Sequence, residues 1–228
     1  MTPEHPRVVA LIAARDEEAT IGRTVQAISR SRAVEVVVVD DGSSDGTAAE
    51  ALAAGATVLR IPGGIGKGGA MEGALRRLAP ADVWLFADAD LGGSAEGLRV
   101  VVDVVTQGRA DLAVALLPPQ EGGGLGTVRR AAAAAIRRLS GFEAQQPLSG
   151  QRAISAECLA AVRPLAGGFG VETAMTIDAV RAGFRVVEVP VAGLTHRATG
   201  RTWRGFAHRG RQGAQIARAA LARVTRLR

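Results

Sequence analysis

Two carboxylates, Asp88 and Asp90, directly follow the apolar run Val83–Ala87. That run has the length and composition of a buried strand, and residues two apart in an extended chain point to the same side. Both side chains should therefore face one point beyond the strand end, where like charges are costly unless a cation or proton joins them. Mg2+ or Mn2+ suits such a pair, because hard cations prefer oxygen ligands. The alternative is a solvated turn, in which Asp is common.

Acidic or glycine-rich loops stand at four predicted strand ends. These loops are Ala14–Glu18, Asp40–Thr47, Gly63–Gly69 and Asp88–Gly93. The third loop holds Lys67, the only lysine of the chain. Glycines let a backbone approach a ligand closely, and a compact ammonium among them suits a phosphate group; chance retention of one lysine is the alternative. A carboxylate such as Glu17 or Asp41 suits a base N–H or a ribose hydroxyl, so the four loops together indicate one site.

Apolar runs of strand length alternate with stretches of helical spacing through the first half of the chain. We predict strands at 8–13, 34–39, 57–61, 83–87 and 112–117, and helices at 19–28, 47–54, 69–78 and 96–105. In the second half we predict helices at 127–139, 155–162 and 172–182, with strands at 145–153 and 185–189. This rhythm predicts one Rossmann-like α/β domain, with a mostly parallel mixed sheet covered by helices on both faces. Ligands of such sheets bind beyond the carboxyl ends of the strands.

The positive charge of the chain is concentrated at its C-terminal end. Of 228 residues with a formal net charge of +6, the segment from Arg197 to Arg228 contains nine arginines and no acid. We therefore predict a basic tail helix over 196–228 with an anionic partner, either lipid headgroups or a phosphorylated acceptor. Nucleic acid is disfavoured, because aromatic residues are only 3% of the chain and tyrosine is absent.

Cysteine usage and hydropathy bear on the cellular compartment. The one cysteine, Cys158, excludes an internal disulfide and fits a reducing compartment. The longest apolar stretches are far short of a membrane span, and no secretory signal is visible. We expect a cytoplasmic protein, with peripheral contact at the inner face of the membrane through the basic tail.

The four loop segments resemble the signature of glycosyltransferases of the GT-A fold and family-2 type. The matching residues are Ala13–Glu18, Asp40–Thr47, Gly66–Gly69 and Asp88–Leu91. Within that group the chain is similar to dolichyl-phosphate mannose synthases and, more closely in its second half, to glucosyl-3-phosphoglycerate synthases. The second-half likeness rests on Pro147–Gly150, Gly168–Glu172, Ile177-Asp178 and His196-Arg197.

The resemblance implies transfer of a hexose from an NDP-sugar of the UDP-glucose or GDP-mannose type, with Mg2+ or Mn2+, to a phosphorylated or lipid-phosphate acceptor. It divides the transferase domain, residues 1–195, into a donor-binding half at about 1–117 and an acceptor half at about 118–195. It assigns the donor to Ala13, Ala14, Glu17, Asp40, Asp41, Lys67, Asp88 and Ala89. It assigns the metal to Asp88 and Asp90, a DXD motif, together with His196.

The resemblance also implies catalytic and acceptor residues. Asp90 and Glu172 are the implied catalytic residues, with Glu172 as a base or as an anchor for a sugar hydroxyl. A helix N-terminal acid favoured by the dipole is the alternative for Glu172. The implied acceptor-binding residues are Ser149, Gly150, Arg197 and Arg201.

Two other functions are weighed against transfer. A sugar-1-phosphate nucleotidyltransferase needs a glycine-rich, arginine-containing loop after the first strand, and Arg15–Glu18 contains no glycine. A non-catalytic, membrane-associated protein of the same fold would use only the basic tail. Intact acids at every expected position disfavour that second alternative.

Overall fold

The computed structural model describes residues 6–31, 34–61, 65–118, 126–167 and 170–195. Within these ranges, seven strands form one sheet in the order β3-β2-β1-β4-β6-β5-β7. The strands are β1 (Val8–Ala14), β2 (Val34–Asp40), β3 (Thr57–Arg60), β4 (Val83–Asp88), β5 (Leu112–Leu116), β6 (Arg152–Ser155) and β7 (Val186–Pro190). Strand β6 runs antiparallel to β4 and β5, whereas the other neighbours are parallel. The predicted mixed, mostly parallel sheet is confirmed.

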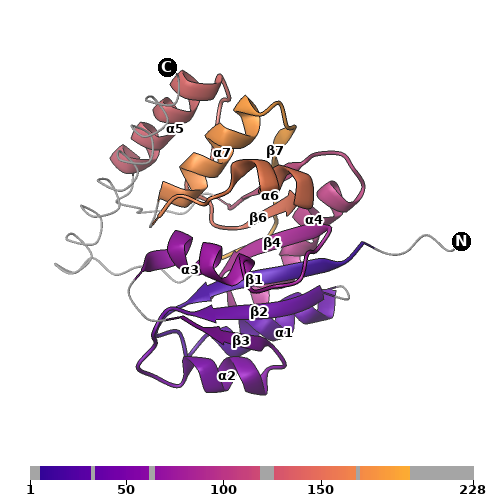
Figure 1. The fold of residues 1–228 in the computed structure, drawn as a ribbon, viewed down its shortest axis with the longest axis vertical. Coiled ribbons are helices and arrows are strands. Elements are labelled where there is room, and N and C mark those ends of the chain that lie inside the picture. The colour runs from indigo at the N-terminus through magenta and orange to yellow at the C-terminus, as the bar shows by residue number, and fades with distance from the viewer. Residues whose placement is uncertain (1–5, 32–33, 62–64, 119–125, 168–169, 196–228) are drawn as a thin grey trace, which may run out of the picture.

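Helices cover both faces of the sheet (Figure 1). They are α1 (Ile21–Ser31), α2 (Thr47–Ala53), α3 (Gly66–Leu75), the 3-10 helix η1 (Gly92–Leu98), α4 (Arg99–Thr106), α5 (Gly126–Ser140), α6 (Ala156–Val162) and α7 (Val171–Arg181). Helices α1, α2, η1 and α4 share one buried cluster with the sheet, and α3, α6 and α7 share the other. Helix α5 packs against α7.

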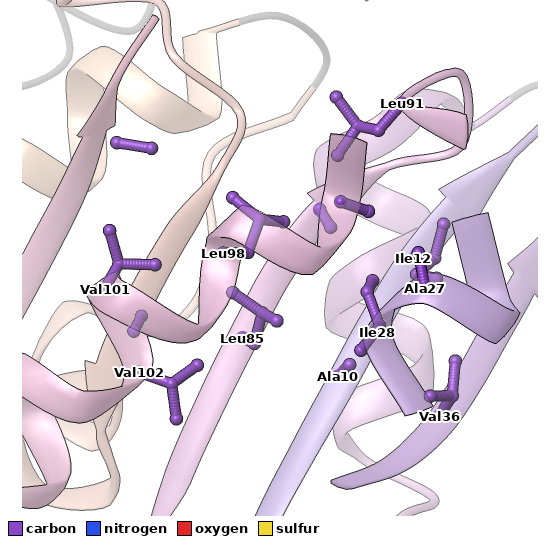
Figure 2. Packing of buried hydrophobic residues seen from close by; sticks show 14 of the residues in the cluster. Ala10, Ile12, Ala27, Ile28, Val36, Leu85, Leu91, Leu98, Val101 and Val102 are labelled. Carbon is purple, nitrogen blue, oxygen red and sulfur yellow. The ribbon is translucent and has the colours of Figure 1, made fainter. Parts of the chain in front are cut away.

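Strand alternation explains the two clusters. On β1, Ala10 and Ile12 face the first cluster, and Val9 and Leu11 face the second. Figure 2 shows the first cluster, where side chains of η1 and α4 lie over β4 and those of α1 lie over β1. Because successive side chains of a strand point to opposite faces, a strand between two helical layers must be apolar throughout, as the near-continuous runs of the sequence are.

Several elements depart from their predicted bounds. Helix α1 begins two residues later and ends three residues later than predicted. The predicted helix 96–105 is two pieces, η1 and α4, since Gly92, Gly93 and Ser94 are poor α-helix formers. Helix α3 begins at Gly66, three residues before its predicted start. The predicted strand 145–153 is instead Arg152–Ser155. The predicted tail helix lies outside the described residues, and within them no helix has the length and apolar character to cross a bilayer.

Candidate functional site

The carboxyl ends of β2, β1 and β4 form one edge of the sheet. The strand register sets Ala14 beside Asp40 and Ala13 beside Asp88. The two alanines therefore lie between the two acids, on the central strand of this edge. The parallel pairing explains why loops that are distant in sequence meet here, as the order of strand and helix signals predicted.

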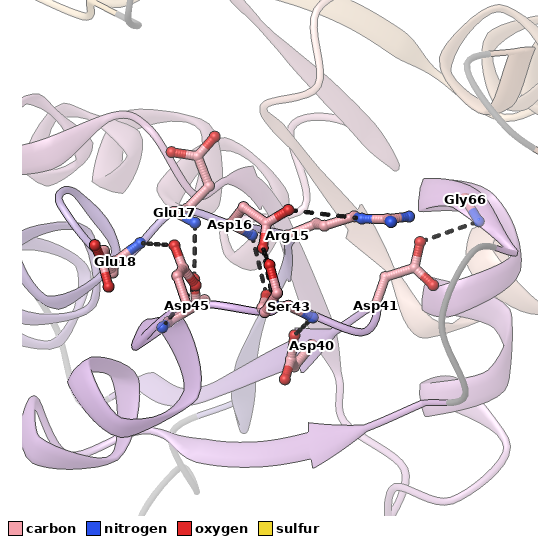
Figure 3. A network of polar contacts seen from close by, with 11 residues as sticks. Arg15, Asp16, Glu17, Glu18, Asp40, Asp41, Ser43, Asp45 and Gly66 are labelled. Carbon is pink, nitrogen blue, oxygen red and sulfur yellow. Dashed lines mark hydrogen bonds and ion pairs between the residues drawn. The ribbon is translucent and has the colours of Figure 1, made fainter.

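The loops that follow β1 and β2 are joined by polar contacts (Figure 3). The carboxylate of Asp40, which is 1% exposed, accepts the backbone N–H of Ser43 at 2.8 Å. The Ser43 hydroxyl accepts the backbone N–H of Asp16 at 3.0 Å, and the Thr47 hydroxyl accepts that of Glu17 at 2.7 Å. These bonds fix the first loop against the second before any ligand is present.

The two predicted nucleoside contacts lie in different parts of this network. Asp41, which is buried, accepts the backbone N–H of Gly66 at 3.1 Å, at the start of α3. Glu17 accepts the hydroxyl of Thr20 at 3.0 Å and points away from Asp41 (Figure 3). The contact to Gly66 explains the early start of α3, because an acid that accepts a free N–H stabilises a helix N-terminus.

Lys67 stands at the centre of the site, in the first turn of α3. Its ammonium donates to Asp88 Oδ1 at 2.6 Å and forms an ion pair with Glu172 Oε1 at 2.9 Å. Burial alone would lower the pKa of Lys67, but the charges of Asp88 and Glu172 and the hydrogen bonds to them raise it above its usual value. The amine is therefore a fixed cation, and it joins the end of β4 to the first turn of α7.

The segment before β6, in the predicted acceptor half, closes this group from the other side. The antiparallel register sets Arg152 opposite Phe86, so two residues earlier Gly150 comes level with Asp88. A Cβ atom on Gly150 would stand 2.5 Å from Lys67 Nζ and 2.6 Å from Asp88 Oδ2. Glycine is needed at this position because the ion pair occupies the space that a side chain would take.

The remaining oxygen of Asp88 is held by a residue that sequence reasoning missed. Gln151, which is 1% exposed, donates from Nε2 to Asp88 Oδ2 at 2.6 Å. The hydroxyl of Ser149, a predicted acceptor residue, donates to Gln151 Oε1 at 3.3 Å. A second missed residue, Arg152, is 1% exposed and directly follows. The one sequence signal for both is a pair of long polar residues at the start of a short apolar strand.

Two of the three predicted metal ligands, Asp88 and Asp90, lie within the described residues. Asp90 is half-buried in the turn after β4, and Ala89 is buried, with its carbonyl accepting the Thr24 hydroxyl at 2.9 Å. Among the described residues no group of three or more His, Cys, Asp or Glu side chains is gathered as for a metal ion. The third predicted ligand, His196, lies outside the described residues, as do Arg197 and Arg201.

Comparison with known proteins decides the family. The model of glycosyl transferase family 2 matches residues 9–164, which include all four strand-end loops and the Ser149–Arg152 segment. The chain belongs to glycosyl transferase family 2. The expected family is thereby confirmed, and the nucleotidyltransferase alternative loses its support.

Individual relatives refine the likeness. Glycosyltransferase AglJ of Haloferax volcanii is 28% identical over 192 residues, which are 82% of this chain and 63% of the relative. Glucosyl-3-phosphoglycerate synthase of Mycobacterium tuberculosis is 32% identical over 197 residues, which are 75% of this chain and 60% of the relative. The chain therefore spans about three fifths of the length of these curated relatives.

The fold is similar to solved structures of that mycobacterial synthase. A complex with Mn2+, UDP-glucose and phosphoglyceric acid superposes with a TM-score of 0.79 at 28% identity, covering 96% of this chain and 79% of the other. A complex with Mg2+ and UDP gives the same TM-score, identity and coverage. These likenesses confirm the predicted GT-A fold.

Proposed function

We propose that this chain is a metal-dependent hexosyltransferase that uses UDP-glucose or a related NDP-sugar. The observation that carries the proposal is the Lys67 ammonium, held between Asp88 and Glu172 where the strand-end loops meet the Ser149–Gly150 segment. A fixed, protonated amine in a partly closed site stabilises negative charge as it develops on a leaving diphosphate. Membership of family 2 and the likeness to a UDP-glucose complex support this reading.

The predicted donor residues would contact different parts of the NDP-sugar. Asp41 and Glu17 lie in the loops after β2 and β1, where they would accept hydrogen bonds from the nucleoside. Ala13 and Ala14 end β1 between these loops, where they would contact the donor. Lys67 would donate to a phosphate oxygen while it keeps its contacts with Asp88 and Glu172, since an ammonium has three donors.

Carboxylate oxygens at the end of β4 fit Mg2+ or Mn2+, which are hard cations. Asp88, Asp90 and, from outside the described residues, His196 would hold the ion. When bound, such an ion neutralises diphosphate charge. Each carboxylate oxygen can accept more than one contact, so Asp88 could bind the ion while it keeps its contacts with Lys67 and Gln151.

The acceptor that the arrangement favours is a small phosphorylated molecule. Glu172 stands beside Lys67, where it would orient a sugar or acceptor hydroxyl. Arg197 and Arg201 would hold the acceptor phosphate, a role for which a guanidinium fork is suited. The solved complexes with phosphoglyceric acid support this class. The alternative acceptor is a lipid phosphate, which the basic tail would hold at a membrane surface.

Thermal-shift measurements on the full chain test the proposal. A donor at about 100 times its Kd adds about 2.7 kcal/mol to the folded state, so UDP-glucose with Mn2+ should raise the Tm by roughly 5–10 °C. Asp90→Ala should keep the fold but lose both the shift and sugar transfer. Glu96→Ala, which removes an exposed acid from η1, is the matched control. Full transfer activity in Asp90→Ala would refute the proposed role of the acidic turn.

A further inference from the structure

Arg152 is a buried cation beside the proposed active site. Its guanidinium donates from Nε to the carbonyl of Ser149 at 2.7 Å and from Nη1 to the carbonyl of Glu172 at 2.8 Å. Nη1 also donates to the Thr176 hydroxyl at 2.8 Å, and Nη2 reaches the Pro147 carbonyl at 3.4 Å. One side chain thus joins the loop before β6 to the first turn of α7.

These contacts complete a closed ring of polar groups. Starting from the guanidinium, the ring runs through Arg152, Ser149, Gln151, Asp88, Lys67 and Glu172, and then returns to Arg152. Lys67 and Asp88 come from α3 and β4, which carry donor loops. The other members come from the segment before β6 and from α7. The ring is therefore a side-chain connection between the two sides of the site, beside the backbone pairing of β4 with β6.

The Arg152 guanidinium is held by neutral acceptors. Within the described residues, no carboxylate forms an ion pair with Arg152. Burial lowers the pKa of Arg152 to about 10, although the charges of Glu172, Glu188 and Asp88 partly offset it. Removal of the guanidinium would leave the buried acceptors that it bonds without their donor, which is costly. What an apolar side chain lacks is the planar fork that holds several carbonyls at fixed positions.

We propose that Arg152 is a positioning residue, which holds the Ser149–Gly150 segment and the first turn of α7 so that Gly150 and Glu172 close on Lys67. The inference rests on the proposed function and extends it to a residue outside the predicted donor and acceptor sets. It follows from the ring that loss of the guanidinium frees Glu172 and Gly150 first, and loosens Lys67 second. Within the described residues the hydrogen bonds of Arg152 go to Pro147, Ser149, Glu172 and Thr176 and none goes to the loops after β1 and β2, so nucleotide binding should change less than acceptor use.

The single lysine provides a readout that does not depend on activity. Acylation by acetic anhydride, followed by mass spectrometry of the peptide that carries Lys67, measures how tightly the ring holds this amine. In the full chain, Arg152→Met should raise the Lys67 acylation rate at least tenfold, and Arg152→Lys should raise it by a smaller factor. Ile154→Ala is the matched control, because Ile154 is equally buried on the same strand but packs in the apolar cluster.

Kinetics with UDP-glucose, Mn2+ and phosphoglyceric acid provide the second readout. Arg152→Met should raise the acceptor KM at least tenfold while the donor KM changes less than threefold. If Arg152→Met does not fold, Arg152→Lys, which keeps the charge but loses the fork, carries the same test. Lys67 acylation at the wild-type rate in the folded Arg152 variant, or an equal increase in Ile154→Ala, overturns the inference. A wild-type chain that transfers no sugar refutes the proposed function instead, and the acylation experiment still decides the role of Arg152.

Discussion

Replacement of Gly150 by alanine is the sharpest test of the central ion pair. An added Cβ would stand 2.5 Å from Lys67 Nζ, 2.6 Å from Asp88 Oδ2 and 2.7 Å from Asp88 Oδ1, whereas ordinary contact begins at 3.4 Å. The ammonium and the carboxylate must therefore retreat by about 0.9 Å from the new methyl group. The backbone of Gly150 is outside the left-handed region, so only the contact opposes the substitution.

The expected effect is large on activity and small on stability. A misplacement of about 1 Å at reacting groups costs on the order of 100-fold in rate, which corresponds to about 2.7 kcal/mol of transition-state stabilisation. Overpacking costs about 1–3 kcal/mol of folding free energy. The reduced freedom of the unfolded chain returns about 0.4–1 kcal/mol of that cost. Gly150→Ala should therefore remain folded at 25 °C with its transfer activity reduced about 100-fold.

Steady-state release of UDP from UDP-glucose, with Mn2+ and phosphoglyceric acid, measures this loss as kcat/KM. Gly22→Ala is the matched control, because a Cβ there meets its nearest neighbour, the carbonyl of Glu50, at an ordinary 3.6 Å. It adds the same methyl group on α1 and should leave kcat/KM unchanged. A Gly150→Ala enzyme within threefold of wild type would refute the reasoning, since it would mean that the ion pair does not need the space beside Gly150.

Three further outcomes are expected. Glu72 accepts a hydrogen bond from Arg163 at 2.9 Å. Burial raises the pKa of Glu72, but this bond and its other partners outweigh burial, so the pKa lies below its ordinary value of 4.5. The stabilisation by the Glu72 carboxylate is therefore present above pH 4.5 and is lost on acidification. Glu72→Gln should cost about 1–3 kcal/mol in urea unfolding at pH 7, and a deficit that does not shrink below pH 4.5 contradicts the linkage. Burial raises the pKa of Cys158 to about 12, so Ellman's reagent should label it only after denaturation; rapid labelling of the native chain would disprove that burial. Joint replacement of Arg197 and Arg201 should raise the acceptor KM more than the donor KM, and an unchanged acceptor KM argues against a phosphate role.

The parallel part of the sheet was predictable because each of its strands can be recognised from its own residues. Strands buried on both faces are near-continuous apolar runs, so β1, β2 and β4 begin where the sequence places them and end one residue later. The acids that follow these runs were predictable for the same reason. Helix α3 was harder to place, since its first turn contains several glycines and is stabilised by Asp41, which is 25 positions before Gly66.

The acceptor side was only partly predictable because it depends on an antiparallel pairing. A short apolar stretch such as Ala153-Ile154 does not indicate which strand it pairs with, or whether the pairing is parallel or antiparallel. The residues before it were assigned to the site by resemblance alone, and Gln151 and Arg152 were missed. Their importance appears only once Arg152 lies opposite Phe86, because that register sets Gly150 and Gln151 against Asp88.

The sheet order explains why one carboxylate serves both sides of the site. Strand β6, from the predicted acceptor half, lies between β4 and β5, both from the predicted donor half. Asp88 at the end of β4 therefore has the donor strand β1 on one side and the start of β6 on the other. A cation at the N-terminus of α3 is opposed by the helix dipole, so Lys67 depends on Asp88 and on Glu172 of α7. Lys67 therefore reaches this arrangement only when the interleaved sheet is complete, and the contacts on both sides of Asp88 are then set together.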